Sequence, residues 1–299
     1  MIKMKTNMEN KIIPESELVL NSDGSVYHLH LKEIHIADTV ILVGDQGRVE
    51  QVSKHFDTIE YKIQNREFIT HTGLYQGKRI TVISTGIGPD NIDIAINELD
   101  AAINIDLQNR TFKKEKRVLD IIRIGTSGAL QQDIPVDSFV VSEFGLGLEG
   151  LVYYYDYPFD EKEAELTENI NNHLHWNPNL SKPYIVKGSS SLIEKIGEGM
   201  TRGITATASG FYGPQGRKLR LKLDNPDLNE RLTSFEHEGH RVTNFEMETS
   251  ALYGLGALLG HNCCTCCAII ANRITQKYSE NHSIVVDNLI KTVLGRLVG

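Results

Sequence analysis

Short apolar runs, each followed by a glycine-containing turn, recur along this chain, and the first two of them precede an amphipathic stretch. Thr39–Val43, Ile80–Ser84 and Val118–Ile124 are such runs. Apolar runs of this length are typical of strands that are buried on both faces of a sheet. Apolar residues then recur at helical spacing over Arg48–Phe56 and Ile92–Leu99. The alternation predicts an α/β fold, a central mixed β-sheet flanked by α-helices, with ligands at the carboxyl ends of its strands.

Composition excludes some functional classes. The 299 residues include 31 Lys and Arg against 39 Asp and Glu, a formal net charge of −8. This balance excludes a strongly basic nucleic-acid-binding protein, so we expect no nucleic-acid partner. The first twenty residues contain no apolar stretch of the length that a secretory signal needs. We therefore expect a cytoplasmic protein without membrane attachment.

We expect residues 1–299 to form a single domain, because no repeat or low-complexity linker divides the chain. Residues 1–25 are expected to be an N-terminal extension. Residues 104–117 are polar and are expected to be a surface insertion or an extended helix end. Tyr153–Pro183 contains several tyrosines and prolines and is expected to be a loop-rich connection.

All four cysteines lie within Cys263–Cys267. Such crowding suits neither a disulfide framework nor a tetrahedral zinc site, so we expect buried thiols in a strand and no metal. The surrounding segment, Ala251–Ala271, is apolar enough to suggest a membrane span, but Gly260 and the two polar residues after it interrupt it. We expect a helix, a turn and a buried strand there.

Two glycine-containing segments after predicted strands are candidate anion sites. In Gly44–Arg48, glycine permits close backbone approach, a helix N-terminus offers unpaired N–H groups, and arginine adds a cation. Arg123–Gly128 is a second predicted turn with a cation, two glycines and two hydroxyls. A tight structural turn is the alternative explanation for the first segment, and a surface salt bridge of Arg123 is the alternative for the second. Gly145–Gly150 fits the dinucleotide-binding pattern, but no convincing helix start follows it, so we expect no dinucleotide site.

Several segments between Tyr27 and Arg273, in their order and spacing, resemble the family of purine nucleoside and uridine phosphorylases. They are Tyr27–Leu31, Gly44–Arg48, Arg66–Phe68, Ser84–Gly88, Arg123–Gly128, Phe211–Arg217 and Asn244–Thr249. The resemblance implies a single-domain nucleoside phosphorylase fold and a pentosyltransferase that uses phosphate as co-substrate, without a cofactor or metal. It also implies a homodimer as the minimal unit, with a hexamer built as a trimer of dimers as the larger alternative.

The resemblance also assigns residues to the three parts of a site. For phosphate they are Gly44, Arg48, Arg123, Thr126 and, from a neighbouring subunit, Arg66. For ribose they are Glu246, Met247, Glu248 and, across the dimer contact, His28. For the base they are Phe211, Gln215 and Arg217, with Arg273 supporting Arg217. The catalytic residues that it implies are Arg123, Glu248, Arg217 and Gln215.

A pyrimidine base is favoured by the residues around its expected pocket. The Gln215 amide offers a donor and an acceptor to uracil, and Arg217 can stabilise charge on a carbonyl oxygen. Purine-specific relatives carry a Ser-Asp pair where this chain has Ala271–Asn272. The resemblance therefore implies reversible phosphorolysis of uridine to uracil and ribose 1-phosphate. The alternatives are a purine or broad-specificity phosphorylase, a nucleosidase, and a catalytically silent nucleoside-binding homologue.

The segment around the predicted ribose carboxylates has a second explanation that needs no ligand. Thr243 and Glu246 have the spacing of a capping box, and Glu248 would then lie in the first turn of a helix. A carboxylate there is favourable to the helix dipole by itself.

Overall fold

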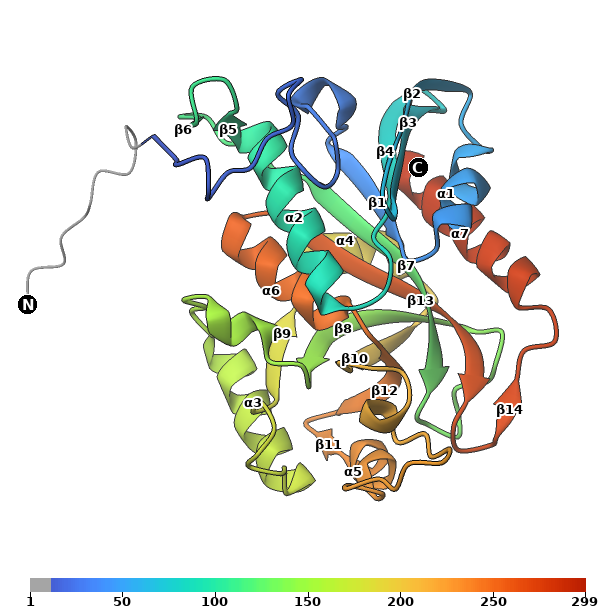
Figure 1. Cartoon of the computed structure of the whole chain (residues 1–299). Coiled ribbons are helices and arrows are strands. Elements are labelled where there is room, and N and C mark those ends of the chain that lie inside the picture. The colour runs from blue at the N-terminus through green and yellow to red at the C-terminus, as the bar shows by residue number, and fades with distance from the viewer. Residues whose placement is uncertain (1–11) are drawn as a thin grey trace, which may run out of the picture.

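A computed structural model describes residues 12–299, in which the predicted α/β architecture is present (Figure 1). Residues 1–11 of the expected N-terminal extension lie outside the described residues. The strands of the main sheet are β1 (Thr39–Val43), β2 (Thr58–Asn65), β3 (Phe68–Tyr75), β4 (Lys78–Ser84), β7 (Asp120–Ala129), β8 (Phe139–Gly147), β9 (Tyr184–Lys187), β10 (Thr201–Thr207), β11 (Glu236–His237), β12 (His240–Glu246), β13 (Asn262–Asn272) and β14 (Lys277–Tyr278). The helices are α1 (Gln46–Ser53), α2 (Pro89–Asn104), α3 (Glu161–Leu174), α4 (Ser190–Ile196), α5 (Leu228–Ser234), α6 (Thr249–Leu259) and α7 (His282–Val298), with short 3₁₀ helices η2 (Glu33–His35), η3 (Leu151–Tyr154) and η4 (Gly213–Gln215).

The sheet is mixed, as predicted. Its main path runs β11-β12-β10-β8-β13-β7-β1-β4-β3-β2. β1 pairs in parallel with β4 and β7, and β13 pairs in parallel with β7, whereas β2, β3 and β4 are antiparallel neighbours. The far end of β7 also pairs with β12 in antiparallel fashion. The carboxyl end of β12 is thereby brought beside β7, although the two strands are distant in sequence.

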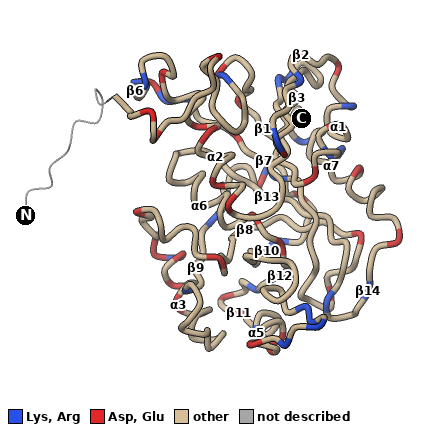
Figure 2. The backbone as a smooth tube through the Cα atoms, in the orientation of Figure 1, with Lys and Arg blue, Asp and Glu red and all other residues tan. Residues whose placement is uncertain are grey.

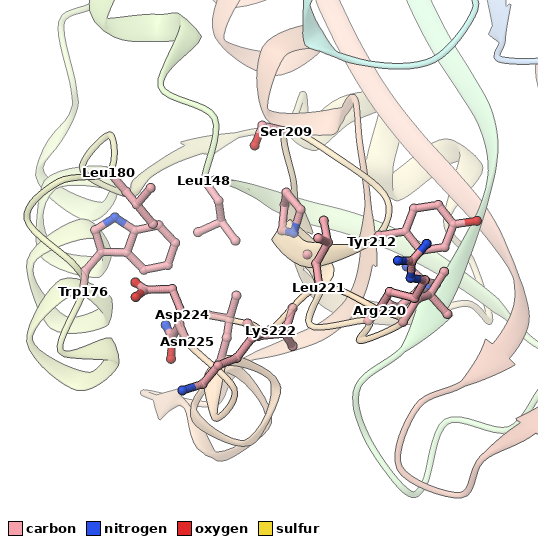
Figure 3. A pocket seen from close by; sticks show the side chains of 16 residues that line it. Leu148, Trp176, Leu180, Ser209, Tyr212, Arg220, Leu221, Lys222, Asp224 and Asn225 are labelled. Carbon is pink, nitrogen blue, oxygen red and sulfur yellow. The ribbon is translucent and has the colours of Figure 1, made fainter.

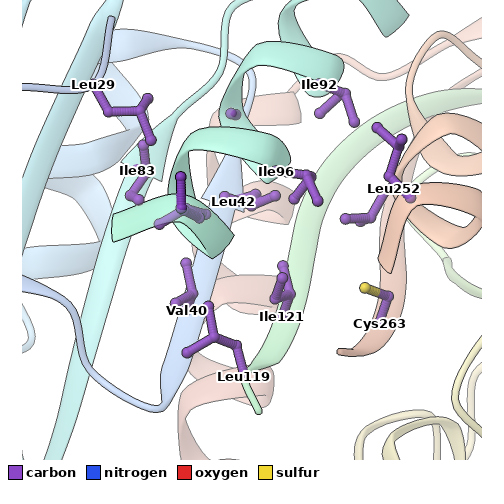
Figure 4. Close-up of a cluster of buried hydrophobic side chains, with 14 of the residues drawn as sticks. Leu29, Val40, Leu42, Ile83, Ile92, Ile96, Leu119, Ile121, Leu252 and Cys263 are labelled. Carbon is purple, nitrogen blue, oxygen red and sulfur yellow. The ribbon is translucent and has the colours of Figure 1, made fainter. Parts of the chain in front are cut away.

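Helices cover both faces of the sheet because its central strands are apolar on both sides. Val40 and Leu42 of β1 belong to the core beneath α2 and α6, shown in Figure 4, whereas Ile41 and Val43 pack in the core beneath α1, α4 and α7. Alternate residues of a strand point to opposite faces, so a continuous apolar run serves two cores at once.

The two helices predicted from apolar spacing are both present, with different bounds for the first. α1 begins at Gln46, where the Asp45 side chain accepts a hydrogen bond from the backbone N–H of Gly47 (2.6 Å), and ends at Ser53. α2 begins with Pro89 directly after Gly88, whose φ of 105° requires glycine. A third core forms between the lower part of the sheet and the helices α3 and α5.

Two predictions of irregular structure are wrong. Tyr153–Pro183 is not a loop-rich connection throughout, because it contains α3, which opens with a capping box between Asp160 and Glu163. Arg123–Gly128 is not a turn but part of β7, because its backbone pairs with β1, β12 and β13. The 104–117 segment, by contrast, is a surface excursion that contains a small hairpin, β5 (Ile105–Asp106) and β6 (Thr111–Phe112).

The apolar segment near the C-terminus has the predicted order of helix, turn and buried strand. α6 ends at Gly260, which has a left-handed backbone (φ 81°), and β13 follows. All four thiols are free and buried in β13, and burial raises the pKa of Cys263 and Cys267, so these thiols are neutral. None of the helices within residues 12–299 combines the length and the hydropathy that a membrane span requires.

Replacing Ile96 with alanine tests the packing of α2. Ile96 is fully buried against the sheet, so Ile96→Ala should lower the free energy of unfolding by about 2–5 kcal/mol. Ile284→Ala is the matched control, because Ile284 lies on α7 with 59% of its side chain exposed, and should change stability by no more than about 0.5 kcal/mol. Urea unfolding of both variants measures the difference. Equal losses would contradict the assignment of Ile96 to the core.

Candidate active site

Most of the predicted site residues line one cavity of about 480 Å³. The predicted residues that line this cavity are Gly44, Arg48, Arg123, Thr126, Phe211, Gln215, Arg217, Glu246, Met247 and Glu248. They come from the carboxyl ends of β1 and β12, from β7 and from the η4 region. The phosphate, ribose and base residues implied by the resemblance are therefore neighbours in space, except those expected from another subunit.

Arg123 is the most buried cation of this cavity, with 4% of its surface exposed. It shares a face of β7 with Ile121 and Gly125, directed towards the starts of α2 and α6. Its Nη2 donates to the Glu248 carboxylate, and its Nη1 lies 3.7 Å from Oε2 of Glu246. Within residues 12–299, Nε and Nη1 have no hydrogen-bond partner. Buried donors without partners are costly, so these two groups are suited to bind an anion that enters the cavity.

Gly125 makes room for this arginine. A methyl group added at Gly125 would overlap Nη1 of Arg123, because the two residues are next-but-one neighbours on the same face of the strand. Burial opposes the charge on Arg123, but the carboxylates of Glu248 and Glu246 outweigh it and raise the Arg123 pKa. The guanidinium is therefore charged and held in place.

Arg48 adds a second cation at the start of α1. Its Nη1 donates to the backbone carbonyl of Ile124 (3.3 Å), and burial together with the nearby Arg123 lowers its pKa. Gly44 comes close to the backbone of Gly86, since a Cβ at Gly44 would lie 3.3 Å from the Gly86 carbonyl oxygen. Two neighbouring guanidiniums beside glycine backbone form a site for a multiply charged anion.

The two predicted ribose carboxylates have different environments. Glu246 accepts hydrogen bonds from Oγ1 of Thr207 (2.7 Å) and from the backbone N–H groups of Glu248 (2.9 Å) and Thr249 (3.0 Å). Its oxygens therefore fix the start of α6 rather than remain free for a ligand. Glu248 accepts from the backbone N–H of Gly88 (2.9 Å), and burial raises its pKa to about 7.

The capping-box alternative is wrong in its details. Thr243 lies within β12, and α6 begins only at Thr249, with Glu248 at the N-cap position. Glu246 does stabilise the start of the helix, but it does so through the N–H of Thr249 and not through a box with Thr243. The reason is that β12 extends to Glu246, paired with β10.

The base-side residues form a connected group. Nη1 of Arg217 donates to Oε1 of Gln215 (2.5 Å) and to the carbonyl of Phe211 (2.6 Å), and its guanidinium lies 3.8 Å from the centre of the Phe211 ring. Burial and the nearby Arg273 lower the Arg217 pKa to about 10. Arg273 thus acts on Arg217 by like-charge repulsion. Negative charge that develops on a bound group near both arginines would relieve this repulsion.

His28 and Arg66 do not line this cavity in the single chain. They lie close to each other, because the Arg66 guanidinium is 5.3 Å from the ring centre of Tyr27, the residue next to His28. Nδ1 of His28 is itself 2.6 Å from Oε1 of Glu98. Asn65 links the two by donating to the carbonyl of His28 (2.8 Å). Their expected contribution to a neighbouring subunit stays a prediction.

Several residues of the site were not predicted from the sequence as its members. Ile87 and Tyr278 line the cavity, and Gly88 holds Glu248. The signal for Gly88 was its place between a predicted strand and a predicted helix, where a backbone N–H is unpaired. Tyr278 gave no signal, because only the pairing of β14 with β13 places it opposite Ala271.

One group of possible metal ligands is present among the described residues, and it lies elsewhere. Ligand atoms of Glu165, His237 and Glu238 are within 4.8 Å of one another. Lys162 already pairs with both carboxylates of this group, since its Nζ is 2.6 Å from an oxygen of Glu238 and 3.3 Å from an oxygen of Glu165. The expectation that the reaction needs no metal or cofactor stays a prediction.

Comparison with known proteins gives concordant matches. The family model described as the phosphorylase superfamily matches residues 38–295. A uridine phosphorylase of Thermococcus kodakarensis is 33% identical over 267 residues, which cover 86% of this chain and 81% of the relative. A DeoD-type purine nucleoside phosphorylase of Clostridium perfringens is 28% identical, covering 89% and 96%. A solved nucleoside phosphorylase of Trypanosoma brucei, described as showing uridine phosphorylase activity, has a TM-score of 0.86 at 29% identity, covering 94% of this chain and 99% of the other.

Gly125→Ala tests the anion site without removing a charge. The added methyl group would displace the Arg123 guanidinium, so we expect the affinity for inorganic phosphate to fall roughly 10–100-fold, the range for one lost charge-assisted contact. Gly295→Ala is the matched control, because nothing lies within 4 Å of a Cβ there. Titration calorimetry with phosphate measures both. Unchanged affinity in a folded Gly125→Ala protein would exclude Arg123 from the anion site.

Proposed function

The chain belongs to the phosphorylase superfamily, and from this premise we propose that it is a uridine phosphorylase. It cleaves the bond between uracil and C1′ of the ribose, and phosphate takes the place of the base. The products are uracil and ribose 1-phosphate, and the reaction is reversible. A role in pyrimidine salvage follows from this chemistry.

The observation that carries the proposal is the unpartnered Arg123 beside Arg48. Two donors of a buried guanidinium have no partner within residues 12–299, and a second guanidinium lies close by. Water does not require such a concentration of positive charge in a protein with a net charge of −8, whereas a phosphate dianion does. The arrangement therefore favours phosphorolysis over hydrolysis by a nucleosidase.

The residues divide the reaction between three positions. Arg48, Arg123, Thr126 and the backbone of Gly44 hold phosphate so that one of its oxygens faces C1′. As the bond to the base breaks, its electron pair moves onto the base, and positive character develops on the ribose. The Glu248 carboxylate stabilises that positive character and accepts from the sugar hydroxyls, and Met247 packs against the ring. Arg217 and Gln215 stabilise the charge on the departing base.

The surroundings of Asn272 support a pyrimidine as the base. Its Nδ2 donates to the carbonyls of Gln131 (2.8 Å) and Ile134 (2.7 Å), and its Oδ1 accepts from the N–H of Ile274 (2.9 Å). The side chain at the position where purine-specific relatives carry an acid is therefore neutral, and its amide is fully occupied by backbone groups of its own loop and of the segment after β7. It has no proton to give to a purine ring nitrogen.

We propose a homodimer as the working unit, in which Arg66 and His28 complete the phosphate and ribose positions of the other subunit. Both lie outside the cavity of their own chain but close to each other, so one contact could deliver both. A hexamer built from such dimers, and the cytoplasmic location expected from the sequence, remain predictions.

Uracil release from uridine, with phosphate present and with phosphate rigorously removed, tests the proposed function. We expect uracil to be released only when phosphate is present. Chromatography follows the release of uracil and detects ribose 1-phosphate as the second product. Equal release under both conditions would identify a nucleosidase. Release from inosine or adenosine but not from uridine would identify a purine phosphorylase, and no release from any nucleoside would identify a binding homologue.

Glu248 should give the reaction a distinctive dependence on pH. Burial raises its pKa from 4.5 to about 7, so the carboxylate is neutralised by protonation as the pH falls through 7. The loss of its charge should lower kcat/KM at pH 6 to roughly a tenth of the plateau value. Inorganic phosphate also changes its protonation state in this pH range. The control is therefore Glu248→Gln, in which the titration of phosphate still affects the rate but the carboxyl group is absent. The same acidic limb in both proteins would rule out Glu248 as its source.

A further inference from the structure

A second cavity, of about 900 Å³, borders the candidate active site (Figure 3). Its wall on that side is η4: Pro214 faces the second cavity and Gln215 faces the first, and Arg217 lines both. The other walls come from distant parts of the chain, including Leu148 after β8 and Trp176 after α3. None of the proposed chemistry uses this space.

Large apolar side chains are exposed around this cavity. Leu180, Leu219 and Leu221 are 51%, 72% and 83% exposed, and Figure 3 shows Leu180, Trp176 and Leu148 gathered on one side of the space, across from Leu221. Exposed apolar side chains that gather at one hollow mark a binding site more often than an ordinary surface. The volume lies in the range of pockets for small molecules.

The chain segment 217–223 gives the cavity a basic rim. Leu219, Leu221 and Leu223 alternate with Lys218, Arg220 and Lys222, and Figure 2 shows basic residues gathered beside α5. Arg231 on α5 has an acidic partner, Asp227 at 3.7 Å, whereas the three basic residues of the rim have none among the described residues.

This rim also has unused hydrogen-bonding groups. Within the described part of the chain, residues 218–223 form no backbone hydrogen bond with one another or with a neighbouring segment. Asp224, the acidic residue next to them, already accepts a hydrogen bond from Nδ2 of Asn177 (2.8 Å). The cavity therefore combines an apolar interior with free positive charge and free N–H groups at its edge.

We propose that this second cavity binds a small amphipathic anion, whose apolar body lies among Trp176, Leu180 and Leu221 and whose carboxylate, sulfonate or phosphate meets Arg220 and Lys222. Charge complementarity favours such a ligand over a second copy of the chain. If two copies met here about a twofold axis, the same basic rims would face each other and repel.

Occupation of this cavity should affect the base position through Arg217. An anion near the rim would draw the Arg217 guanidinium away from Gln215 and Phe211, or would fix it in place, and either change alters how the base is held. This consequence depends on the proposed function, and it predicts a change in KM for uridine. The binding itself does not depend on activity and is tested separately.

The chain has one tryptophan, Trp176, and it lies in the wall of this cavity, so its fluorescence reports occupancy. We would titrate the full-length protein with 8-anilinonaphthalene-1-sulfonate, an apolar anion, and with the neutral N-phenyl-1-naphthylamine. We expect saturable quenching of Trp176 emission by the anion at one site per chain, with weaker binding of the neutral probe. Trp176→Phe should abolish the tryptophan emission itself, which assigns the quenched signal to this residue.

Two surface variants separate the charged from the apolar part of the site. Reversing Arg220 and Lys222 to glutamate should weaken the anion roughly tenfold or more, the effect of losing about one charged contact, and leave the neutral probe unchanged. Leu221→Asp should weaken both probes, and its high exposure makes misfolding no obstacle. Lys114→Glu, on the distant 104–117 segment, is the matched charge-reversal control and should change neither.

Three results would overturn the proposal. The first is an absence of saturable quenching. The second is an affinity for the anion that is unchanged by the double charge reversal and by Leu221→Asp but is abolished by uridine with phosphate. This result would place the probe in the candidate active site. The third is a lower sedimentation coefficient of the Leu221→Asp variant together with binding of the anion only to the dissociated chain. This result would assign the cavity to a contact between two copies of the chain. Uracil release, measured separately, shows whether the proposed function fails by itself.

Discussion

A charged guanidinium buried in the sheet is the constraint on which the site depends. Arg123 lies on the face of β7 that otherwise packs beneath α2 and α6, and it is stable there because Glu248 and Glu246 oppose its charge. The positions of these carboxylates depend in turn on the start of α6 and on the Gly88 N–H at the start of α2. The side chain at position 125 must be hydrogen, because any larger one would occupy the same space as the guanidinium.

The same ion pair couples the two halves of the reaction. Arg123 donates to Glu248 in the chain without ligands, so a phosphate that binds Arg123 competes with the carboxylate that is to face the ribose. Weakening this bond would leave Glu248 freer to accept from the sugar hydroxyls. The partner of Glu248 on its other oxygen, Gly88, would still hold it in position.

Local patterns in the sequence predicted those elements whose structure depends on their own residues. The apolar runs at Thr39–Val43 and Ile80–Ser84 are strands, and the spacing of Ile92, Ile96 and Leu99 is that of α2. Arg123–Gly128 was mistaken for a turn because its glycines serve packing against a side chain, not a change in chain direction. The helix α3 was missed although Asp160 and Glu163 carry its capping signal, because tyrosines and prolines around it favoured a loop.

The sequence by itself determined the fold class, the types of side chain needed for an anion, a sugar and a base, and the family to which these belong. These follow from local periodicity and from the order of motifs along the chain, both of which are visible in the sequence alone. The tertiary structure alone decided which donors of Arg123 lack partners, that Glu246 is occupied by the start of α6, and that the Asn272 amide donates to the segment after β7. The contacts of Arg123 and Asn272 join segments more than a hundred residues apart, and pairing of β7 with β12 and β13 brings those segments together.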